Sequence, residues 1–336
     1  MKIDTEKAQL VSKTHTAYGW AERTGMYALA AVYNAFAAAD VRCLGVEADI
    51  GIPADISGPE SAAGVSRGSG SEALPERDEF RPEKKTAGLI AHRIEKALRN
   101  VCIKQGIELA GIRITRNPLL LVPAVTITGM GLAAAGDEDS RRSGQAGEEA
   151  YMQGQQETDK EGYEIVLTKW IGMEGMLRIA EEKDEELRQR FAPVFMRQIH
   201  SYEKELFAGK ELEIARAAKV TVIRQITEGG ILAGLWELSK ETDMGLDLDM
   251  KKMSVLQETI EVCEHFRMNP YQLASAGSFL MLTEDGRKLA DAMRENQIQA
   301  SVIGKLIPGK NKLIHNGGDV RYLDRPASDE IYKLFI

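Results

Sequence analysis

The sequence predicts an α+β fold built as two domains, and three observations support this. The chain has 336 residues, which suffices for two domains that each bury an apolar core. Both halves contain short apolar runs of strand length and longer segments whose apolar residues recur with helical spacing. These segments do not follow a strict β-α-β order, so an α+β arrangement is favoured.

Two polar stretches mark the expected boundaries. Residues 53–85 are rich in Gly, Ser, Pro, Glu and Arg, which predicts a long insertion within a first domain of residues 1–134. Residues 135–161 are acidic and Gln-rich and predict an interdomain linker. The second domain is then expected at residues 162–325, with a short tail at 326–336.

The expected elements of the first domain are two helices and two strands. The helix predicted from Gly25 to Ala39 is dominated by alanine, which allows close packing on a sheet or another helix. A second helix is predicted from Thr86 to Gln105, where apolar residues lie near helical period. Apolar runs predict strands at Cys43–Ile52 and Leu119–Thr128.

The second domain is expected to be more regular. Strands are predicted at Glu164–Thr168, Val220–Ile223, Gly245–Leu248, Ser278–Leu282 and Ala300–Ile307. Helices are predicted at Met173–Arg190, Pro193–Leu206, Glu228–Lys240, Ser254–Phe266 and Gly286–Asn296.

Composition and charge exclude several classes of function. The formal net charge is -8, and no stretch forms a dense Lys/Arg cluster, so neither nucleic acid nor an anionic membrane is expected as a partner. No apolar run is long enough to span a bilayer, and the first residues lack the apolar core of a signal peptide. A cytoplasmic location is therefore expected.

Cysteine and histidine spacing predicts neither a disulfide nor a metal site. The three cysteines are Cys43, Cys102 and Cys263, which are far apart and form no CxxC pattern. The five histidines show no HExxH-like spacing. No metal ligand is therefore assigned.

The segment Thr227–Gly230 is the most informative part of the chain. A strand-like run leads into it, and two glycines stand where a helix begins. The first backbone N–H groups of a helix have no partner within the helix, and the helix dipole adds positive potential there. Such a turn can hold a phosphate or a carboxylate. The alternative is a capped helix start without a ligand.

Two further turns accompany it. Thr168 and Lys169 end a predicted strand, and the lysine is expected either to neutralise a phosphate or to lie in solvent. The small residues Ala274–Ser278 precede another strand. By contrast, Gly129 and Gly131 superficially resemble a dinucleotide-binding loop but no apolar helix follows them, so no nicotinamide site is expected.

Three segments together resemble the AIR synthase-related superfamily, most closely its HypE-like members. They are Ile165–Gly175, Ile226–Ile231 and Asn269–Ser278. The superfamily includes aminoimidazole ribonucleotide synthetase, selenophosphate synthetase, thiamine-monophosphate kinase and the hydrogenase-maturation protein HypE. The resemblance implies a two-domain fold with a C-terminal α/β sandwich and a homodimer formed through the N-terminal sheets. It also implies ATP with Mg²⁺ held by acidic residues.

The first half resembles the family less closely and departs from it at acidic positions. The family's Thr-Asp and Asn-Asp pairs correspond to Thr14-His15 and Asn34-Ala35. Its Gly-Gly-acid/His-Thr turn corresponds to Ala110–Arg113, and the sequence begins too late for its Gly-Asp-Asp loop. Because Mg²⁺ prefers carboxylate oxygens, we expect a divergent member with lost or reduced ATPase chemistry.

The resemblance and the turns together predict a set of ligand- or phosphate-binding residues. No catalytic residue is predicted. The predicted binding residues are Asn34, Thr168, Lys169, Thr227, Glu228, Gly229 and Gly230.

Three functions follow from this interpretation. The favoured one is a pseudoenzyme that binds a phosphate-bearing ligand or a partner protein, in hydrogenase or metallocofactor maturation. One alternative is an active ATP-dependent enzyme in which Glu47 or Asp49 holds the metal; the other is a non-catalytic dimeric scaffold. HypE uses a C-terminal cysteine, whereas no cysteine follows Cys263 here, so its cyanide-forming step is not expected.

Overall fold

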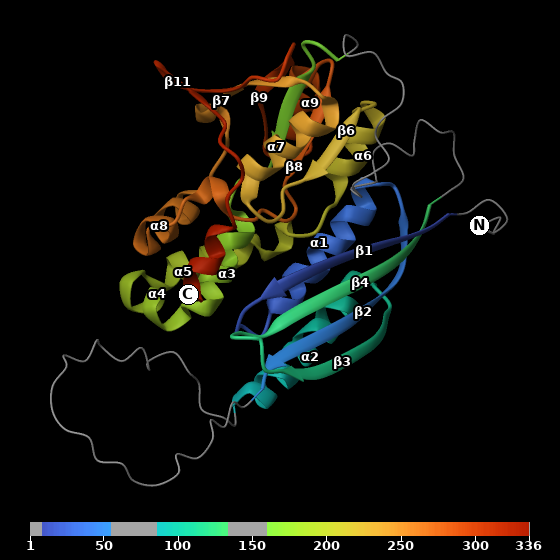
Figure 1. Ribbon diagram of the computed structural model, residues 1–336, viewed down its shortest axis with the longest axis vertical. Helices are drawn as coiled ribbons and strands as arrows, with labels where there is room; N and C mark the ends of the chain where they lie inside the picture. Colours follow the sequence, from blue (N-terminus) through green and yellow to red (C-terminus); the bar gives the residue numbers. More distant parts are fainter. Residues whose placement is uncertain (1–8, 55–85, 134–159, 336) are drawn as a thin grey trace, which may run out of the picture.

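A computed structural model describes residues 9–54, 86–133 and 160–335, and it contains two β-sheets with helices packed on both (Figure 1). The predicted α+β class is confirmed. The predicted insertion at 53–85 and the linker at 135–161 lie almost wholly outside the described residues. The domain boundaries therefore stay predictions.

The N-terminal sheet has the strand order β1-β4-β2-β3, and only β2 and β3 run parallel. Its strands are β1 (Gln9–Tyr18), β2 (Arg42–Pro53), β3 (Leu109–Asn117) and β4 (Ala124–Ala133). Helices α1 (Thr24–Ala38) and α2 (Thr86–Gln105) cover one face of this sheet and lie behind it in Figure 1.

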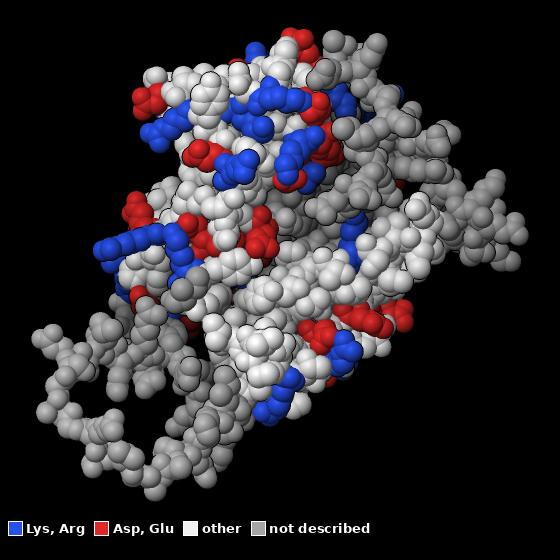
Figure 2. Space-filling view, in the orientation of Figure 1, with Lys and Arg blue, Asp and Glu red and all other residues white. Residues whose placement is uncertain are grey.

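Strand β4 shows why the two faces of this sheet differ. Val125 and Ile127 are buried towards the helices, whereas Thr126 on the other face is hydrogen-bonded to a threonine of β1. A Cβ atom on Gly129 would lie 2.5 Å from Phe36 of α1, so this glycine serves close packing rather than a nucleotide loop. We call the face that α1 and α2 leave uncovered the open face. Figure 2 shows an uncharged band there over β1 and β4.

The second sheet has seven strands in the order β11-β10-β7-β9-β5-β8-β6, and all neighbours are antiparallel except β7 and β10. The strands are β5 (Glu164–Thr168), β6 (Val222–Gln225), β7 (Gly245–Asp249), β8 (Phe279–Thr283), β9 (Ala300–Ile307), β10 (Lys312–Asn316) and β11 (Asp319–Tyr322).

Helices cover both faces of this sheet. On one face, α7 (Gly230–Thr242) packs against Ile165 and Leu167 of β5. On the other face, α6 (Lys210–Ala217) and α9 (Gly286–Glu295) pack around Val166. Successive residues of β5 are thus buried on opposite faces, as expected for a central strand.

A further helical layer joins the two halves of the molecule. It contains α3 (Met173–Glu182), α4 (Asp184–Arg190), α5 (Pro193–Ser201) and α8 (Gln257–Phe266), together with the 3₁₀ turns η2 (Tyr202–Glu205), η4 (Pro270–Gln272) and η5 (Glu330–Leu334). Its apolar residues share one buried core with α1 and α2. The short η3 (Met250–Lys252) follows β7. No helix in the described ranges is long and apolar enough to cross a membrane.

Several predicted boundaries were wrong. The helix predicted from Met173 to Arg190 is two helices that meet at Lys183, because the acidic run that begins at Asp184 suits a new helix N-terminus. The strand predicted at Leu119–Thr128 begins only after Pro123, which cannot donate to a sheet ladder. The predicted turn at Ala110–Arg113 lies within β3.

Other elements were missed or shifted. Helix α6 and strands β1, β3, β10 and β11 had no counterpart among the predictions, because these segments contain many polar residues. The predicted helix from Glu228 begins at Gly230, which leaves Glu228 and Gly229 in the turn itself.

Candidate anion-binding site

The predicted turn before α7 has the backbone conformation that exposes N–H groups. Gly229 and Gly230 both have positive φ, at 77° and 67°. The N–H of Gly230 donates to the carbonyl oxygen of Thr227 at 3.0 Å, which closes the turn. The N–H of Gly229 has its hydrogen-bond acceptor outside the helix. Glycine is needed here because other residues avoid this region of φ.

A carboxylate from the chain itself occupies this turn. Oδ2 of Asp329 accepts hydrogen bonds from the N–H groups of Gly229 at 3.0 Å and Ala274 at 2.9 Å. Its Oδ1 accepts from the N–H of Ile331 at 3.0 Å. Asp329 is 3% exposed, and burial raises the pKa of its carboxyl. The turn is therefore a built anion site, and its occupant lies in the segment that the sequence predicted only as a tail.

The three glycine- and small-residue turns converge around this site. Besides Ala274, the turn Ala274–Ser278 contributes Ser275, whose hydroxyl accepts from the N–H of Gly172 at 2.6 Å. The N–H of Ala276 donates to Glu174 of α3 at 3.1 Å. The turn after β5, the turn before α7 and the turn before β8 thus meet through short hydrogen bonds. Their convergence was beyond what spacing in the sequence could show.

Glu174 and Arg178 on α3 set the charge beside these turns. Burial raises the pKa of Glu174 to about 7, although the Arg178 guanidinium opposes the shift. Nη1 of Arg178 lies 3.5 Å from a Glu174 oxygen, and its Nη2 donates to the carbonyl oxygen of Tyr18 at 3.0 Å. Arg178 is the buried cation that faces Asp329, and its charge lowers the pKa of that carboxyl.

Strand β1 lies on the other side of the C-terminal segment from the turn before α7. Burial and the charge of Arg178 lower the pKa of His15, whereas Glu228 raises it. The Glu228 carboxylate accepts a hydrogen bond from the hydroxyl of Tyr332 at 2.9 Å. The Tyr332 ring packs edge-on against Tyr18 of β1, with ring centres 5.9 Å apart. The C-terminal segment therefore lies between β1 and the turn before α7.

The remaining predicted ligand residues are engaged elsewhere. Nζ of Lys169 is buried and bonds to the carbonyl oxygen of Glu205 and to the Glu211 carboxylate, both at 2.9 Å. The hydroxyl of Thr168 accepts from the N–H of Phe279 at 3.0 Å. Lys169 is thus neither a solvated lysine nor a free cation at the turn, because an internal carboxylate already pairs with it.

Asn34 is a structural residue of α1. Its side-chain amide donates to the carbonyl oxygen of Leu206 at 2.8 Å and accepts from the N–H of Ala208 at 2.6 Å. It is fully buried. Asn34 therefore fastens the N-terminal helix to the segment that follows η2, and the structure does not bring it to the anion site.

The acids suggested as alternative metal ligands lie on another surface. Glu47 and Asp49 belong to β2 and point to the open face of the N-terminal sheet, away from α1. Asp49 accepts a hydrogen bond from Nε of Arg113 on β3 at 3.1 Å. They do not converge with the turn before α7.

Sequence reasoning missed Asp329, Arg178, Glu174 and Tyr332. Asp329 follows a loop without a helical or strand pattern, so nothing local marked it. Glu174 and Arg178 are four residues apart on α3, which places them on one helix face, and that spacing was a usable signal.

The fold and the anion-holding turn define a two-sheet α+β protein with its anion site beside the junction of its halves.

Comparison with known proteins agrees with this class. Residues 160–316 match the family described as AIR synthase related protein, C-terminal domain. The comparison with curated proteins gave no match. The family match covers the C-terminal half of the chain, and the fold shared with HypE and AaThiL extends over both halves.

Solved structures share the fold at low identity. Escherichia coli HypE, a hydrogenase maturation protein, is 14% identical with a TM-score of 0.61, covering 96% of this chain and 88% of its own. HypE in complex with ATP is 13% identical, with a TM-score of 0.60 and coverage of 96% and 87%. AaThiL complexed with AMPPCP and TMP is 12% identical, with a TM-score of 0.57 and coverage of 94% and 87%.

Proposed function

We propose that this chain binds a phosphate-bearing ligand at the turn before α7, in competition with its own Asp329. The observation that carries the proposal is the carboxylate bound by the N–H groups of Gly229 and Ala274. Backbone N–H groups at a helix start recognise phosphate oxygens by the same chemistry as carboxylate oxygens. A ligand phosphate would take the place of Asp329 and face Arg178.

We infer that the ligand is a nucleotide or a similar phosphate ester and that ATP turnover is absent or slow. HypE and AaThiL structures of this fold hold ATP and AMPPCP, which supports the ligand class. Position 15, where the resemblance leads us to expect an acid, carries His15, whose pKa is lowered by burial and by Arg178. A half-buried histidine near a guanidinium is a poor substitute for an oxygen ligand of Mg²⁺.

The biological setting we propose is a cytoplasmic, homodimeric protein that acts in hydrogenase or metallocofactor maturation. This rests on the likeness of fold to HypE. The ligand-binding proposal does not depend on it, since the anion site is formed by this chain's own residues.

A non-catalytic scaffold is the second candidate, and a specific observation favours it. Asp329 fills the anion site, and Glu330 accepts a hydrogen bond from the N–H of Asn269 at 3.1 Å. Ile331 is buried in the core shared with α3. The C-terminal segment is thus well anchored, and on this view it completes the fold permanently.

Calorimetric titration of the full-length chain with ATP, ADP and inorganic phosphate, each with and without Mg²⁺, separates these functions. Asp329→Ala removes the internal competitor, so we expect at least tenfold tighter nucleotide binding than in the wild type. Asp324→Ala is the matched control, because Asp324 lies exposed in the same segment. Circular dichroism checks that both variants fold.

The outcomes are distinct. Binding that is tighter only in Asp329→Ala supports competition at the turn. No binding of any of these anions to either protein supports the scaffold. Tight Mg²⁺-dependent ATP binding with turnover would contradict the loss of ATPase chemistry and favour an active enzyme.

A further inference from the structure

Three side chains with metal-ligating atoms meet where α3, α5 and η2 pack beside α1. They are Glu181 near the end of α3, His200 in α5 and Glu203 in η2. One ligand atom of each lies within 4.8 Å of the others. Among the residues that the structure describes, this is the single group of three or more such side chains with that geometry. It lies apart from the turn that holds Asp329.

The same place gathers polar atoms that lack hydrogen bonds. Of the nine buried side-chain nitrogen and oxygen atoms without a hydrogen bond in the described parts of the chain, four are here. They are both carboxylate oxygens of Glu181, Nδ1 of His200 and the hydroxyl of Tyr27. The Tyr27 hydroxyl lies beside the Glu181 carboxylate and interacts with it, but the two do not form a hydrogen bond of normal geometry. Burial and this carboxylate raise the pKa of Tyr27.

This concentration of unsatisfied atoms needs an explanation. The Glu181 side chain is 9% exposed, and Tyr27 is 1% exposed, so bulk water does not complete their hydrogen bonds. Leaving a buried polar atom unpaired costs free energy, and native structures resolve such groups with an ion or an ordered water. Donor and acceptor atoms converging on one point therefore indicate a ligand.

In this structure the cation beside the two carboxylates is Arg23. Nη1 of Arg23 lies 3.5 Å from Oε1 of Glu181 and forms an ion pair with Glu203. Nδ1 of His200 lies 3.4 Å from Oε1 of Glu203. One guanidinium thus faces two carboxylates, so a divalent ion in its place would balance both charges with a neutral imidazole as third ligand.

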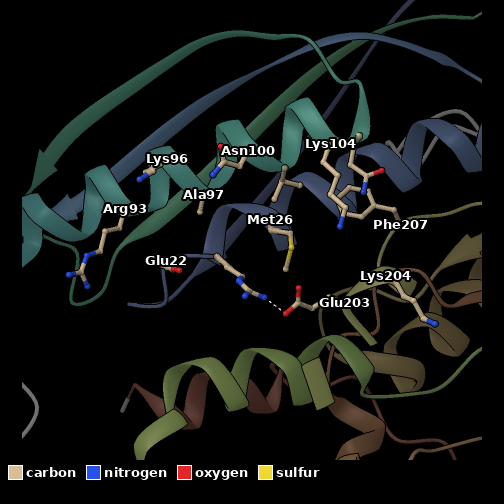
Figure 3. A pocket seen from close by; sticks show the side chains of 13 residues that line it. Glu22, Met26, Arg93, Lys96, Ala97, Asn100, Lys104, Glu203, Lys204 and Phe207 are labelled. Carbon is tan, nitrogen blue, oxygen red and sulfur yellow. Dashed lines mark hydrogen bonds and ion pairs between the residues drawn. The ribbon is translucent and has the colours of Figure 1, made fainter. Parts of the chain in front are cut away.

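An ion also has a route to this cluster. Glu203 and Arg23 line a pocket of about 500 Å³ between α2 and η2 (Figure 3), where their ion pair is drawn as a dashed line. The Arg23 side chain is 37% exposed, so it can turn into the pocket as an ion enters. The metal site then forms by exchange of one cation for another.

We propose that Glu181, His200 and Glu203 bind one divalent transition-metal ion, such as Mn²⁺ or Zn²⁺. Two carboxylates and one imidazole form a mixed oxygen and nitrogen donor set, which suits these ions better than Mg²⁺ or Ca²⁺. The ion ties α3, α5 and η2 together beside α1. Spacing could not predict this site, because Glu181 is distant in sequence from the other two ligands.

Mn²⁺ is the probe that tests the proposal, because bound Mn²⁺ loses the electron paramagnetic resonance signal of the free ion. The full-length chain is stripped with a chelator, desalted and titrated without nucleotide. We expect saturable binding of one Mn²⁺ per chain. Glu181→Gln and His200→Gln should each raise the dissociation constant at least tenfold. Arg23→Met should lower it severalfold, because it removes the competing cation.

His265→Gln is the matched control. His265 also pairs with a carboxylate, since its Nε2 lies 2.8 Å from Oε1 of Glu186, but no third ligand from the described residues joins them. This variant should bind Mn²⁺ as the wild type does. Circular dichroism and the melting temperature identify any variant that does not fold, and His200, with a side chain 29% exposed, is the ligand whose substitution disturbs packing least.

Each outcome decides the proposal. Weaker binding in Glu181→Gln and His200→Gln together with tighter binding in Arg23→Met supports it. No saturable binding of Mn²⁺ or Zn²⁺ overturns it, as does wild-type affinity in both ligand variants. Unchanged affinity in Arg23→Met overturns the placement of the ion at the guanidinium. Because no nucleotide is present, these results are separate from those for the anion site.

Discussion

At the residue scale, Glu174 makes stability depend on pH in a direction opposite to that of most acids. Burial raises its pKa to about 7 in the folded chain, against an ordinary value of 4.5. Between these two values the folded state retains a proton that the unfolded state has lost, so stability falls as pH rises. The full effect is about 3 kcal/mol, present below pH 4.5 and lost above pH 7.

The unfolding free energy of the wild type should therefore fall between pH 4.5 and pH 7, and we expect this fall to be smaller in Glu174→Gln. The difference in slope against pH should correspond to at most one proton. Urea unfolding at several pH values measures this. Glu213→Gln, at an exposed acid on α6, serves as the control and should keep the wild-type slope. An identical slope in all three proteins would mean that Glu174 titrates normally.

The buried polar residues show what single positions in a sequence can predict. Thr168 and Lys169 were expected to face a ligand because they lie at a turn, and Asn34 because of the resemblance to the superfamily. The structure buries all three and bonds each to protein groups distant in sequence. Residue type and local pattern indicate that a polar side chain makes a specific interaction. They do not show whether its partner is a ligand or another part of the protein, because the partner lies in an element distant in sequence.

At the element scale, the turn before α7 is fixed by its second glycine. Gly230 has a φ of +67°, and a Cβ atom there would lie 2.5 Å from the carbonyl oxygen of Tyr271 in η4. We expect Gly230→Ala to destabilise the fold by roughly 2–4 kcal/mol, from the left-handed backbone and the contact together. Urea unfolding measures the loss.

Gly111→Ala is the matched control, because a Cβ atom there meets nothing within 4 Å. It should leave stability within about 0.5 kcal/mol of the wild type. If Gly230→Ala were equally mild, the close approach of η4 to the turn would not hold in solution.

Element types were easier to predict than their ends. The long helices α1 and α2 and the apolar strands β5, β8 and β9 lie close to where the sequence predicts them. These elements bury wide apolar faces, and that requirement is visible in sequence. The ends of elements were harder to predict, because they depend on single hydrogen bonds. Strand β4 begins later than predicted, after Pro123, and the helix predicted from Met173 is interrupted at Lys183.

At the scale of the whole molecule, the candidate site depends on segments brought together by folding. The glycine turn was predictable, whereas its occupant, Asp329, arrives from 100 residues away along the chain. The turn after β5, the turn between β6 and α7 and the turn before β8 meet because β5, β8 and β6 are neighbours in the sheet. Strand order is set by contacts between distant segments, which a single sequence does not display.

The open face of the N-terminal sheet is where we expect a second copy of the chain to bind. Leu10 of β1, Leu44 of β2 and Met130 of β4 are 57%, 39% and 41% exposed. Figure 2 shows an uncharged band over β1 and β4. A sheet face with exposed apolar residues on one side is stabilised when a partner covers it. This is the surface that the superfamily resemblance assigns to the homodimer.

Met130→Glu should weaken this dimer at least a hundredfold, because association would bury an unpaired carboxylate. Light scattering with size exclusion measures the mass, which is 37.0 kDa for one chain. Ile103→Glu places the same charge at a site 79% exposed on α2, away from the open face, and should leave the dimer intact. A wild type that stays monomeric at high concentration, or a Met130→Glu dimer of unchanged affinity, would show that the open face has another role.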